Sequence, residues 1–586
     1  MMLAAGLSPA AGAPTETSPT SAVNGWVTST MARMTLEEKV GQLFVQYAYG
    51  ATADTKDNRN VPLYGVQTPA ELVQKYHLGG VIYFNWTDSA NNPQQIATLS
   101  NGLQRAALSQ DSKVQIPLTI ATDQEQGVVY RVGPPATQFP GNMALGAARS
   151  ADDARTAARI TGQELKAMGI NTDFAPVSDV NVNPLNPVIG VRSFSSHPDL
   201  TAQLAAAQVK GYQDDAGISS TAKHFPGHGD TDTDSHTGIP FITHTRDQWE
   251  QIDAPPFKAD IAAGIDMIMT AHIVFEALDP SGDPATLSKP IMTGILRNDL
   301  GFKGVIITDS LGMQGVRDKY GDDEVAVRAL EAGVDQLLMP PDMDAAWNAV
   351  IAAVKSGRIS RADLDAKVRR ILELKYTKGL VAQPYVDPAD LDSVVGTPEH
   401  LATADAITQR TTTLVKNDDG ALPLAVNGTK LLVTGYGVTT TASLGDALAA
   451  QGADVLVDQT GASPTDATIA RAVGKAADKD AVVVTTMKAW DTAVTDKREG
   501  QQKLVEQLLA TGKTVIVVAV RDPYDIAYFD DAPTYLATYS YNPVAMNAVA
   551  KVITGAVNPT GKLPVDIPVA GDPGTVLYPF GRGLSY

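Results

Sequence analysis

The sequence predicts an α/β protein of two domains, with an N-terminal (β/α)8 TIM-type barrel and a smaller C-terminal α/β sandwich domain. Three observations support this prediction. The 586 residues are too many for one hydrophobic core. Short apolar runs alternate with amphipathic segments along most of the chain, and polar residues stand where several of these runs end. Hydrophobic residues make up 44% of the chain, which is typical of globular domains.

The barrel is expected to span residues 31–375, where seven strand-like runs alternate with helix-like segments. Segment 151–169 is an example of a helix, because it begins at an Asp-rich turn and ends at Gly169. Seven or eight βα units favour a barrel with an irregular first strand, and a doubly wound sheet is the alternative. The runs are residues 79–84, 116–123, 170–177, 219–225, 265–272, 304–310 and 334–340.

Polar side chains stand at the ends of four of these runs, namely Asp123, Lys223 with His224, His272 and Asp309. In a parallel barrel the carboxyl ends of all strands open at one mouth, where active sites form. These side chains should therefore converge at that mouth.

Residues 1–30 are expected to lie outside the barrel, as the remnant of an export signal or as a disordered tail. A short apolar run leads there into an Ala/Gly-rich and then a Ser/Thr/Pro-rich stretch. A full signal peptide needs a basic region, but the first basic residue is Arg33. No apolar run is long enough to span a bilayer. We expect a secreted or cell-surface bacterial protein, with a cytoplasmic location as the alternative.

Residues 376–428 form a predicted linker punctuated by Pro, Gly and Asp. The second domain is expected at residues 429–586, with five further strand-like runs in a mainly parallel sheet. Its Gly-Tyr-Gly at 435–437 lacks the third glycine of a dinucleotide fingerprint, so nucleotide binding is only weakly indicated. The runs are residues 429–437, 453–461, 480–487, 513–523 and 534–542.

Charge and cysteine content exclude several classes of partner and site. The net charge of −19 and the lack of a Lys/Arg cluster argue against a nucleic-acid partner. The chain holds no cysteine, which excludes disulfides, thiolate metal sites and cysteine nucleophiles. The sequence leaves the oligomeric state open.

The stretch 223–236, KHFPGHGDTDTDSH, holds three of the chain's 8 histidines. His224, His228 and His236 could supply nitrogen ligands to zinc. However, a Pro-Gly corner separates the first two, so they cannot share one helical face and a metal is not expected. A purely structural role, in which imidazoles satisfy backbone groups of a long loop, stays open for His228 and for His244.

A calcium loop is also excluded for this stretch. Asp230, Asp232 and Asp234 match the opening of an EF-hand. Ser235 stands where such a loop requires glycine, and Phe241 stands where it requires glutamate.

Acid–base chemistry is the remaining interpretation of the histidine loop. Asp234 and His236 are two residues apart, so in an extended segment their side chains could lie on one side and form a hydrogen bond. A carboxylate on one imidazole nitrogen fixes the tautomer and raises the basicity of the other nitrogen. Asp309, at a strand end on the same barrel mouth, is the natural partner for such a proton donor.

Several motifs together carry a family resemblance. KHFPGHGDTDTDSH, GVIITDSLGM, ATDQEQG and VRSFSSHP resemble the family 3 glycoside hydrolases, and within them the two-domain β-N-acetylglucosaminidase branch. In the second domain LVKNDDGALPL, NPTGKLPVDIP and YPFGRGLSY agree with that family. The resemblance covers nearly the whole chain after about residue 30.

The resemblance implies a retaining mechanism through a covalent glycosyl-enzyme. Asp309 falls on the family's nucleophile position, and Asp234 with His236 falls on its acid/base dyad. Further positions match residues that bind the sugar in the −1 subsite, or that lie near it in the case of the last one. These are Asp123, Arg192, Lys223, His224 and His272.

Two features depart from the family pattern. Gln126 replaces a glycine and Val128 replaces an arginine in the stretch that follows Asp123, which puts that loop of the subsite in question. The segment 48–65 resembles an insertion that extends the barrel mouth and alters the preference for the leaving group.

The sequence therefore predicts an exo-acting β-N-acetylglucosaminidase that acts on fragments of bacterial cell wall or chitin. The alternatives are a phosphorylase of the same family, acting on β-N-acetylglucosaminides or β-glucosides, and a non-catalytic sugar-binding protein. The chemistry needs one carboxylate nucleophile and one proton donor, and no metal or cofactor. The expected partner is a small GlcNAc-terminated glycoside.

Overall fold

The computed structural model describes residues 19–109, 114–317 and 319–586. Residues 1–18, which make up most of the predicted export remnant or tail, lie outside the described residues. Helix α1 (Pro19–Arg33) begins inside the stretch expected to be a tail. Val27 of α1 is fully buried, and the Trp26 ring lies 5.5 Å from that of Tyr376 on α14 (Arg361–Thr377). The barrel domain therefore begins before residue 31.

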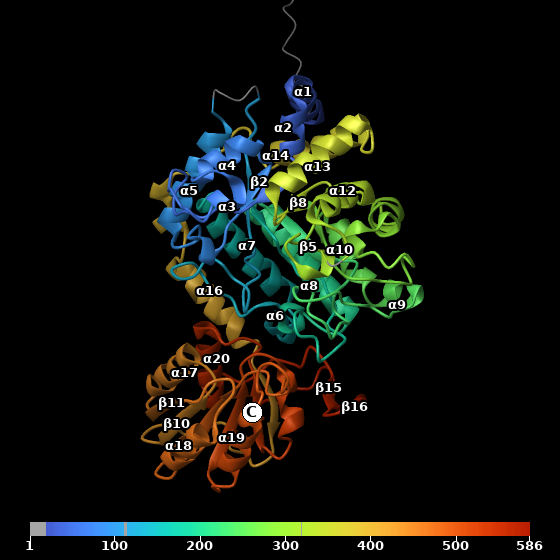
Figure 1. Cartoon of the computed structure of the whole chain (residues 1–586). Coiled ribbons are helices and arrows are strands. Elements are labelled where there is room, and N and C mark those ends of the chain that lie inside the picture. The colour runs from blue at the N-terminus through green and yellow to red at the C-terminus, as the bar shows by residue number, and fades with distance from the viewer. Residues whose placement is uncertain (1–18, 110–113, 318) are drawn as a thin grey trace, which may run out of the picture.

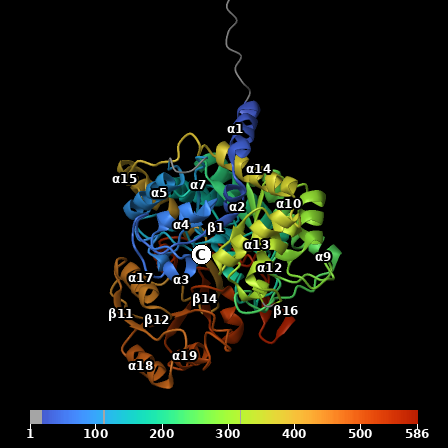
Figure 2. The ribbon, with the colours of Figure 1, turned by 45° about the horizontal axis from the view of Figure 1, so that its top comes forward.

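The first domain is a parallel eight-stranded barrel with helices on its outside (Figures 1 and 2). The strands neighbour one another in the order β7-β6-β5-β4-β3-β2-β1-β8, and Thr308 N–H donates 3.0 Å to the carbonyl of Gln336 where β7 meets β8. The predicted barrel is thus confirmed. Its strands are β1 (Phe44–Gln46), β2 (Gly80–Ile82), β3 (Thr119–Thr122), β4 (Thr172–Asp173), β5 (Ser219–Phe225), β6 (Met267–Thr270), β7 (Val305–Ile307) and β8 (Leu337–Leu338).

Strand β1 is the unit that the seven predicted runs lack. It has three residues, all buried, and pairs in parallel with both neighbours through Val45↔Gly80 and Phe44↔Leu337. The expected irregular first strand is therefore short but regularly paired.

Helices follow the strands around the barrel. Helix α7 illustrates why the sequence folds this way, because the Ser150 hydroxyl caps it by accepting from Asp153 N–H and Gly169 ends it at a φ of +81°. The helices of this domain that follow α1 are α2 (Leu36–Gly41), α3 (Val61–Tyr64), α4 (Pro69–Tyr76), α5 (Pro93–Ala107), α6 (Asn142–Ala148), α7 (Ala151–Ala167), α8 (Pro198–Lys210), α9 (Arg246–Gln251), α10 (Ala254–Ala263), α11 (Gln314–Arg317), α12 (Asp322–Ala332) and α13 (Met343–Ser356), and α14 ends the series.

The predicted linker 376–428 holds structured elements of its own. Helices α15 (Leu391–Val394) and α16 (Pro398–Gln409) run along the barrel, and β9 (Thr413–Asn417) enters the sheet of the second domain. There β9 pairs antiparallel with β14 (Thr534–Ala537).

The second domain is a six-stranded sheet in the order β11-β10-β12-β13-β14-β9, parallel except for β9. A small hairpin of β15 and β16 follows it. The remaining elements are β10 (Lys430–Gly435), β11 (Asp454–Gln459), β12 (Ala481–Thr486), β13 (Thr514–Ala519), β15 (Ile567–Val569), β16 (Asp572–Tyr578), α17 (Val438–Ala449), α18 (Asp466–Ala476), α19 (Gly500–Leu509) and α20 (Pro543–Ile553).

The two domains share part of one buried core. Met143 and Ala144 of α6 and Val191 of the barrel belong to the same hydrophobic cluster as Val482 and Val517 of the second sheet. This cluster fixes the second domain against the barrel loops (Figure 1). Within the described residues, no helix is long and apolar enough to cross a membrane.

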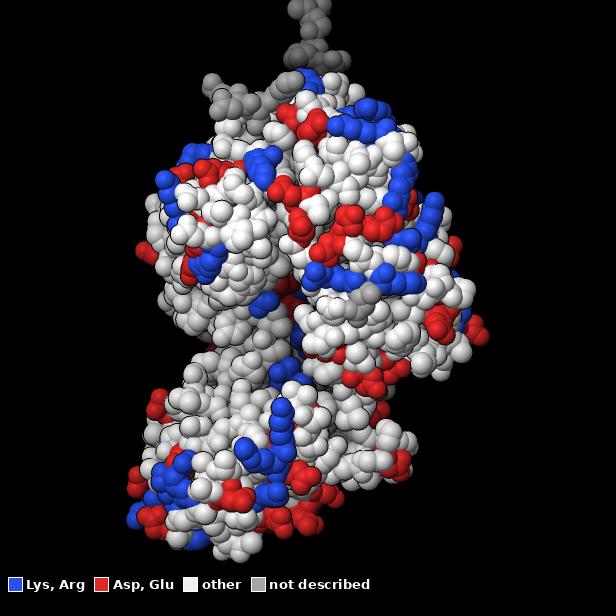
Figure 3. All heavy atoms as spheres, viewed as in Figure 1, with Lys and Arg blue, Asp and Glu red and all other residues white. Residues whose placement is uncertain are grey.

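Polar contacts also cross between the domains. The Ser195 hydroxyl donates 2.5 Å to the carbonyl of Pro564, and the Asn542 amide donates 2.9 Å to the carbonyl of Phe139. These bonds satisfy polar groups that the interface buries. Acidic and basic side chains are interspersed over the face of both domains shown in Figure 3.

Candidate active site

A pocket of about 300 Å³ opens at the carboxyl ends of the barrel strands. Most of the predicted site residues line it, namely Asp123, Arg192, Lys223, His224, His236 and Asp309. Asp234 and His272 lie one residue further out, since each contacts a residue of the pocket wall by a hydrogen bond. Of the polar strand ends predicted to converge, Asp123, Lys223, His224 and Asp309 reach the pocket, whereas His272 does not line it.

Asp309 stands two residues after β7 and is held by its own backbone turn. Its Oδ1 accepts 2.7 Å from the N–H of Ser310. Burial acts to raise the pKa of this carboxyl, but the charge of His224 and other nearby donors outweigh burial and hold the pKa below its usual value. Asp309 is therefore an ionised carboxylate in the pocket.

His272 lies beneath this turn rather than in the pocket. Its Nε2 lies 2.9 Å from the carbonyl of Ser310, and its Nδ1 lies 2.8 Å from the Thr286 hydroxyl. Burial lowers the pKa of the imidazole, which stays neutral. His272 thus supports the backbone next to Asp309.

Asp234 and His236 form the hydrogen bond that their spacing predicted. Asp234 Oδ1 lies 2.7 Å from His236 Nδ1 and also accepts 2.9 Å from the N–H of His236. The segment is a turn rather than an extended run, because Thr237 N–H donates back to the carbonyl of Asp234. The short carboxylate contact raises the pKa of His236 and lowers that of Asp234.

The imidazole of His236 is presented to the pocket from a loop. Its side chain is 59% exposed, and its Nε2 is the nitrogen that Asp234 leaves free. The charge of Asp309 also acts to raise its pKa, which places the two groups on the same cavity.

A buried ion network forms the opposite wall. Lys223 Nζ on β5 donates 2.9 Å to Asp123 Oδ1 and lies 2.7 Å from Glu125 Oε1. The Arg192 guanidinium donates two hydrogen bonds, of 2.9 and 2.8 Å, to the carboxylate of Glu125. Burial acts to raise the pKa of Glu125, but Arg192 and Lys223 outweigh it and lower the pKa. The fixed side chains present carboxylate and cationic groups to a polar ligand.

Sequence reasoning missed two carboxylates of this network. Glu125 stands two residues past Asp123 in DQEQG, and this second acid after a strand end was the available signal. Asp179 is fully buried, lies 2.7 Å from His224 Nδ1 and accepts 2.8 Å from the N–H of His228. Nothing local marks Asp179, because its partners come from another strand.

Two further imidazoles, His228 and His244, hold the histidine loop in place, and His228 also lines the pocket. His228 Nε2 lies 2.9 Å from the hydroxyl of Ser235, the residue between the members of the dyad. His244 bridges two carboxylates, with Nδ1 2.7 Å from Asp253 and Nε2 3.0 Å from Asp230. The structural interpretation thus fits His228 and His244.

Opposite pKa shifts accompany these two roles. Burial lowers the pKa of His228 to about 4, so this ring is neutral. For His244, burial also acts to lower the pKa, but the bonds to Asp230 and Asp253 outweigh it and raise the pKa to about 10. No group of three or more ionisable side chains that could hold a metal occurs within residues 19–109, 114–317 and 319–586.

The two unusual residues of the β3 loop do not line the pocket. Gln126 is buried at a φ of +70°, and its amide donates 2.9 Å to the Thr161 hydroxyl. Val128 packs against the second domain's core. These substitutions therefore join the loop to α7 and to the second domain, and leave Asp123 in the pocket.

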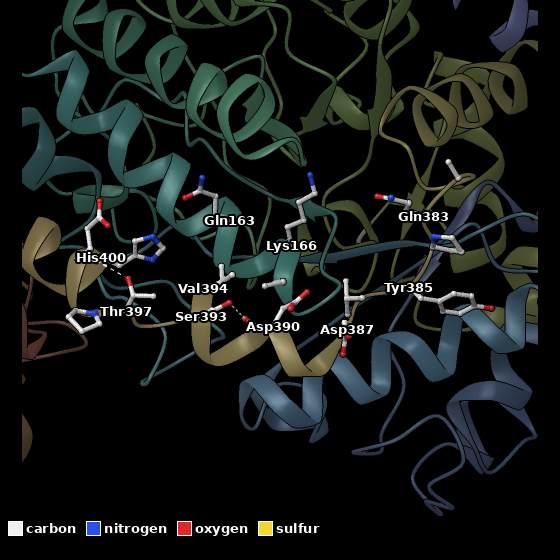
Figure 4. A pocket seen from close by; sticks show the side chains of 16 residues that line it. Gln163, Lys166, Gln383, Tyr385, Asp387, Asp390, Ser393, Val394, Thr397 and His400 are labelled. Carbon is white, nitrogen blue, oxygen red and sulfur yellow. Dashed lines mark hydrogen bonds between the residues drawn. The ribbon is translucent and has the colours of Figure 1, made fainter.

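A larger open groove of about 1100 Å³ lies along α7 and the linker, away from the barrel mouth (Figure 4). Two of its ionisable groups are bonded within the fold, since His400 Nδ1 lies 2.8 Å from Glu164 and Lys166 donates to the carbonyl of Ala216. The groove marks where the linker docks on α7.

Comparison with protein-family models covers almost all of the described chain. Residues 35–374 match the glycosyl hydrolase family 3 N-terminal domain, and residues 412–586 match the C-terminal domain of that family. The second match includes β9, which agrees with its place in the second sheet.

Individual proteins are similar over most of the length. The chain is 36% identical to β-hexosaminidase A of Pseudoalteromonas piscicida, over 85% of this chain and 90% of that protein. It is 28% identical to a β-N-acetylglucosaminidase/β-glucosidase of Cellulomonas fimi, over 92% and 95%. A solved β-N-acetylglucosaminidase of family 3 from Paenibacillus sp. FPU-7 superposes with a TM-score of 0.82 at 37% identity, covering 92% of this chain and 99% of that one.

Proposed function

The chain belongs to glycosyl hydrolase family 3, and we propose that it is a retaining, exo-acting β-N-acetylglucosaminidase. The observation that carries the proposal is the arrangement in one pocket of an ionised Asp309 and a His236 held by Asp234. The name of the solved relative at 37% identity supports GlcNAc as the sugar, and the name of the relative at 36% identity supports a hexosamine.

In the first step, a carboxylate oxygen of Asp309 attacks the anomeric carbon. The glycosidic C–O bond breaks as the proton on His236 Nε2 moves to the departing oxygen. The products are a free alcohol, a glycosyl ester on Asp309 and a neutral His236.

In the second step, neutral His236 takes a proton from an incoming water, and the water oxygen attacks the anomeric carbon. The ester bond breaks, which restores the Asp309 carboxylate and the His236 imidazolium. Two inversions at the same carbon give net retention.

The wall of Asp123, Arg192, Lys223 and His224 is suited to bind the hydroxyl groups of a terminal sugar, because it offers ionised acceptors and donors in fixed positions. The pocket volume of about 300 Å³ fits a terminal sugar better than an internal chain segment, which supports exo action. We take fragments of cell wall or chitin as the substrates, and a secreted or cell-surface location as their natural setting.

Steady-state rates on aryl β-glycosides of GlcNAc and of glucose, each with and without phosphate, test the proposal. We expect turnover of the GlcNAc glycoside, much slower turnover of the glucoside and no acceleration by phosphate. A glucoside preference would place the chain in a glucosidase branch. Release of sugar 1-phosphate with a strong rate increase would identify a phosphorylase instead.

A further inference from the structure

The insertion-like segment 48–65 lies beside the pocket and is held in place by hydrogen bonds. Asn60 is fully buried, and its side-chain amide accepts 2.9 Å from the N–H of Tyr49 and donates 2.8 Å to the carbonyl of the same residue. Gly50 N–H donates 3.0 Å to the carbonyl of Thr87, which connects the segment to the turn after β2. The segment thus has one fixed position against that turn.

The residue that this loop supports is Trp86. Its ring stacks on Phe84 at 5.0 Å and 25°, and the edges of Tyr47 and Tyr49 meet it at 4.9 and 5.7 Å. The Tyr64 hydroxyl donates 2.9 Å to the carbonyl of Tyr47 and holds that residue in place. Trp86 therefore has aromatic neighbours that restrict its orientation.

A guanidinium network braces the outer side of the same cluster. The Arg59 guanidinium lies 4.1 Å from the centre of the Tyr49 ring, and its Nη2 lies 2.6 Å from both Asp57 and Asp88. Charged bonds of this kind fix a side chain that would otherwise move freely at the surface.

Despite this support, Trp86 is 48% exposed and lines the pocket. Phe84, beneath it, is only 7% exposed. A large aromatic side chain that served only the core would be buried, so a rigidly held and half-exposed indole in a pocket wall indicates a contact with a ligand.

We propose that Trp86 is the stacking platform for the sugar on the leaving-group side of the bond that is cleaved. This inference rests on the proposed function and assigns it a preferred substrate class, β-linked oligosaccharides whose leaving group is itself a pyranose ring. In the hydroxyl-binding wall, Asp123 follows β3 and Lys223 lies on β5, and both side chains and that of Arg192 are buried or partly buried.

Trp86 follows β2 (Gly80–Ile82) and is more exposed than that wall. A second sugar ring that extends from the wall toward solvent would therefore contact Trp86. One face of a β-linked pyranose carries mostly C–H groups. These bury apolar area against the indole and meet its electron-rich face.

The variants Trp86→Ala and Trp86→Tyr test the proposal, with N,N′-diacetylchitobiose and methyl β-N-acetylglucosaminide as substrates. For the disaccharide, Trp86→Ala should lower kcat/KM by roughly tenfold or more, whereas Trp86→Tyr should recover most of the loss. For the methyl glycoside, whose leaving group has no ring, both variants should lose much less kcat/KM than they lose for the disaccharide. The methyl glycoside also reports that the variant is folded.

The matched control is Tyr385→Ala, which removes a similarly exposed aromatic side chain in the groove beside α7. This variant should leave kcat/KM unchanged for both substrates. An equal loss of Trp86→Ala on both substrates would overturn the inference, since Trp86 would then shape the pocket itself. No loss on either substrate would overturn it as well.

Failure of the proposed function gives a different result. If the parent hydrolysed glucosides rather than GlcNAc glycosides, the same comparison would be made with cellobiose and methyl β-glucoside. A selective loss on cellobiose would then support the role of Trp86 although the assigned sugar was wrong.

Discussion

Two titratable side chains share the pocket in opposite protonation states. Burial acts to raise the pKa of Asp309, but nearby positive groups and the N–H of Ser310 outweigh burial and lower it. The pKa of His236 is raised by its bond to Asp234. In the proposed mechanism the nucleophile must be ionised and the general acid protonated, and these two shifts favour both states in the same pH range.

The pH dependence of kcat/KM follows from these directions. Activity should fall at low pH as Asp309 takes up a proton, and at high pH as His236 loses one. Asp234→Asn removes the carboxylate that raises the pKa of His236, so the high-pH limb should move to lower pH. An unmoved limb in a pH–rate titration would mean that the limb reports a group other than His236.

Asp309→Asn should lower kcat by a factor on the order of 10⁴ or more, because an amide cannot form the glycosyl ester. Intact mass measurement and peptide mapping after treatment with a 2-deoxy-2-fluoro glycoside should place the label on Asp309 of the parent. A label on another carboxylate, such as Asp123, would contradict the assignment.

His236→Ala should slow substrates with poor leaving groups most, since those need a proton on the departing oxygen. With a nitrophenyl leaving group the first step should survive, and the glycosyl-enzyme should accumulate as a burst in stopped flow. If activated and unactivated substrates slow equally, the imidazole binds the sugar or shapes the loop instead.

At the scale of elements, the loop between β5 (Ser219–Phe225) and β6 (Met267–Thr270) depends on His244 as a charged bridge. Burial raises the pKa of Asp253 to about 6, and the two carboxylates raise that of His244 to about 10. The protonated imidazole therefore stabilises the fold. This contribution is complete at pH values below the ordinary imidazole pKa near 6.5, and it is lost as pH rises through about 10.

His244→Gln should therefore destabilise the protein by about 3 kcal/mol near neutral pH, because it leaves buried Asp253 without its counter-charge. In urea unfolding, the difference from the parent should shrink as pH rises from 7 toward 10. Asp230→Asn keeps the Asp253 contact and should cost less. A difference that grew with pH would show that His244 is neutral in the folded protein.

The elements that the sequence predicts well are those with a local signal. Strand β5 reads as a seven-residue run that ends in Lys223 and His224, and the Asp234–His236 pair is visible because its members are two residues apart. Strand β1 was missed because three residues carry too little pattern. Glu125 was missed because its cationic partners come from other parts of the chain.

At the scale of the whole molecule, the second domain touches the segment that carries Arg192 but supplies no wall of the pocket among the described residues. Buried Lys488 donates 3.0 Å to the carbonyl of Pro187, and the hydroxyl of Tyr524 accepts 3.1 Å from the amide of Asn181. The second domain therefore affects the site indirectly, by holding the barrel segments that carry the pocket residues.

Lys488→Met should raise KM and lower kcat by about tenfold at most, because the pocket wall loses a brace rather than a reacting group. Exposed Lys497→Met is the matched control and should have no effect. A loss in kcat above about a thousandfold, equivalent to about 4 kcal/mol, would show that the second domain supplies an essential group.

The bond between Ser195 and Pro564 has a consequence for the order of events during protein synthesis. A ribosome makes the chain from its N-terminus, so all eight barrel strands exist before the segment around Pro564 is translated. Until then the Ser195 hydroxyl and the buried faces of α6 lack their partners. The nascent barrel therefore exposes these groups until the segment around Pro564 has been made and can pack against them.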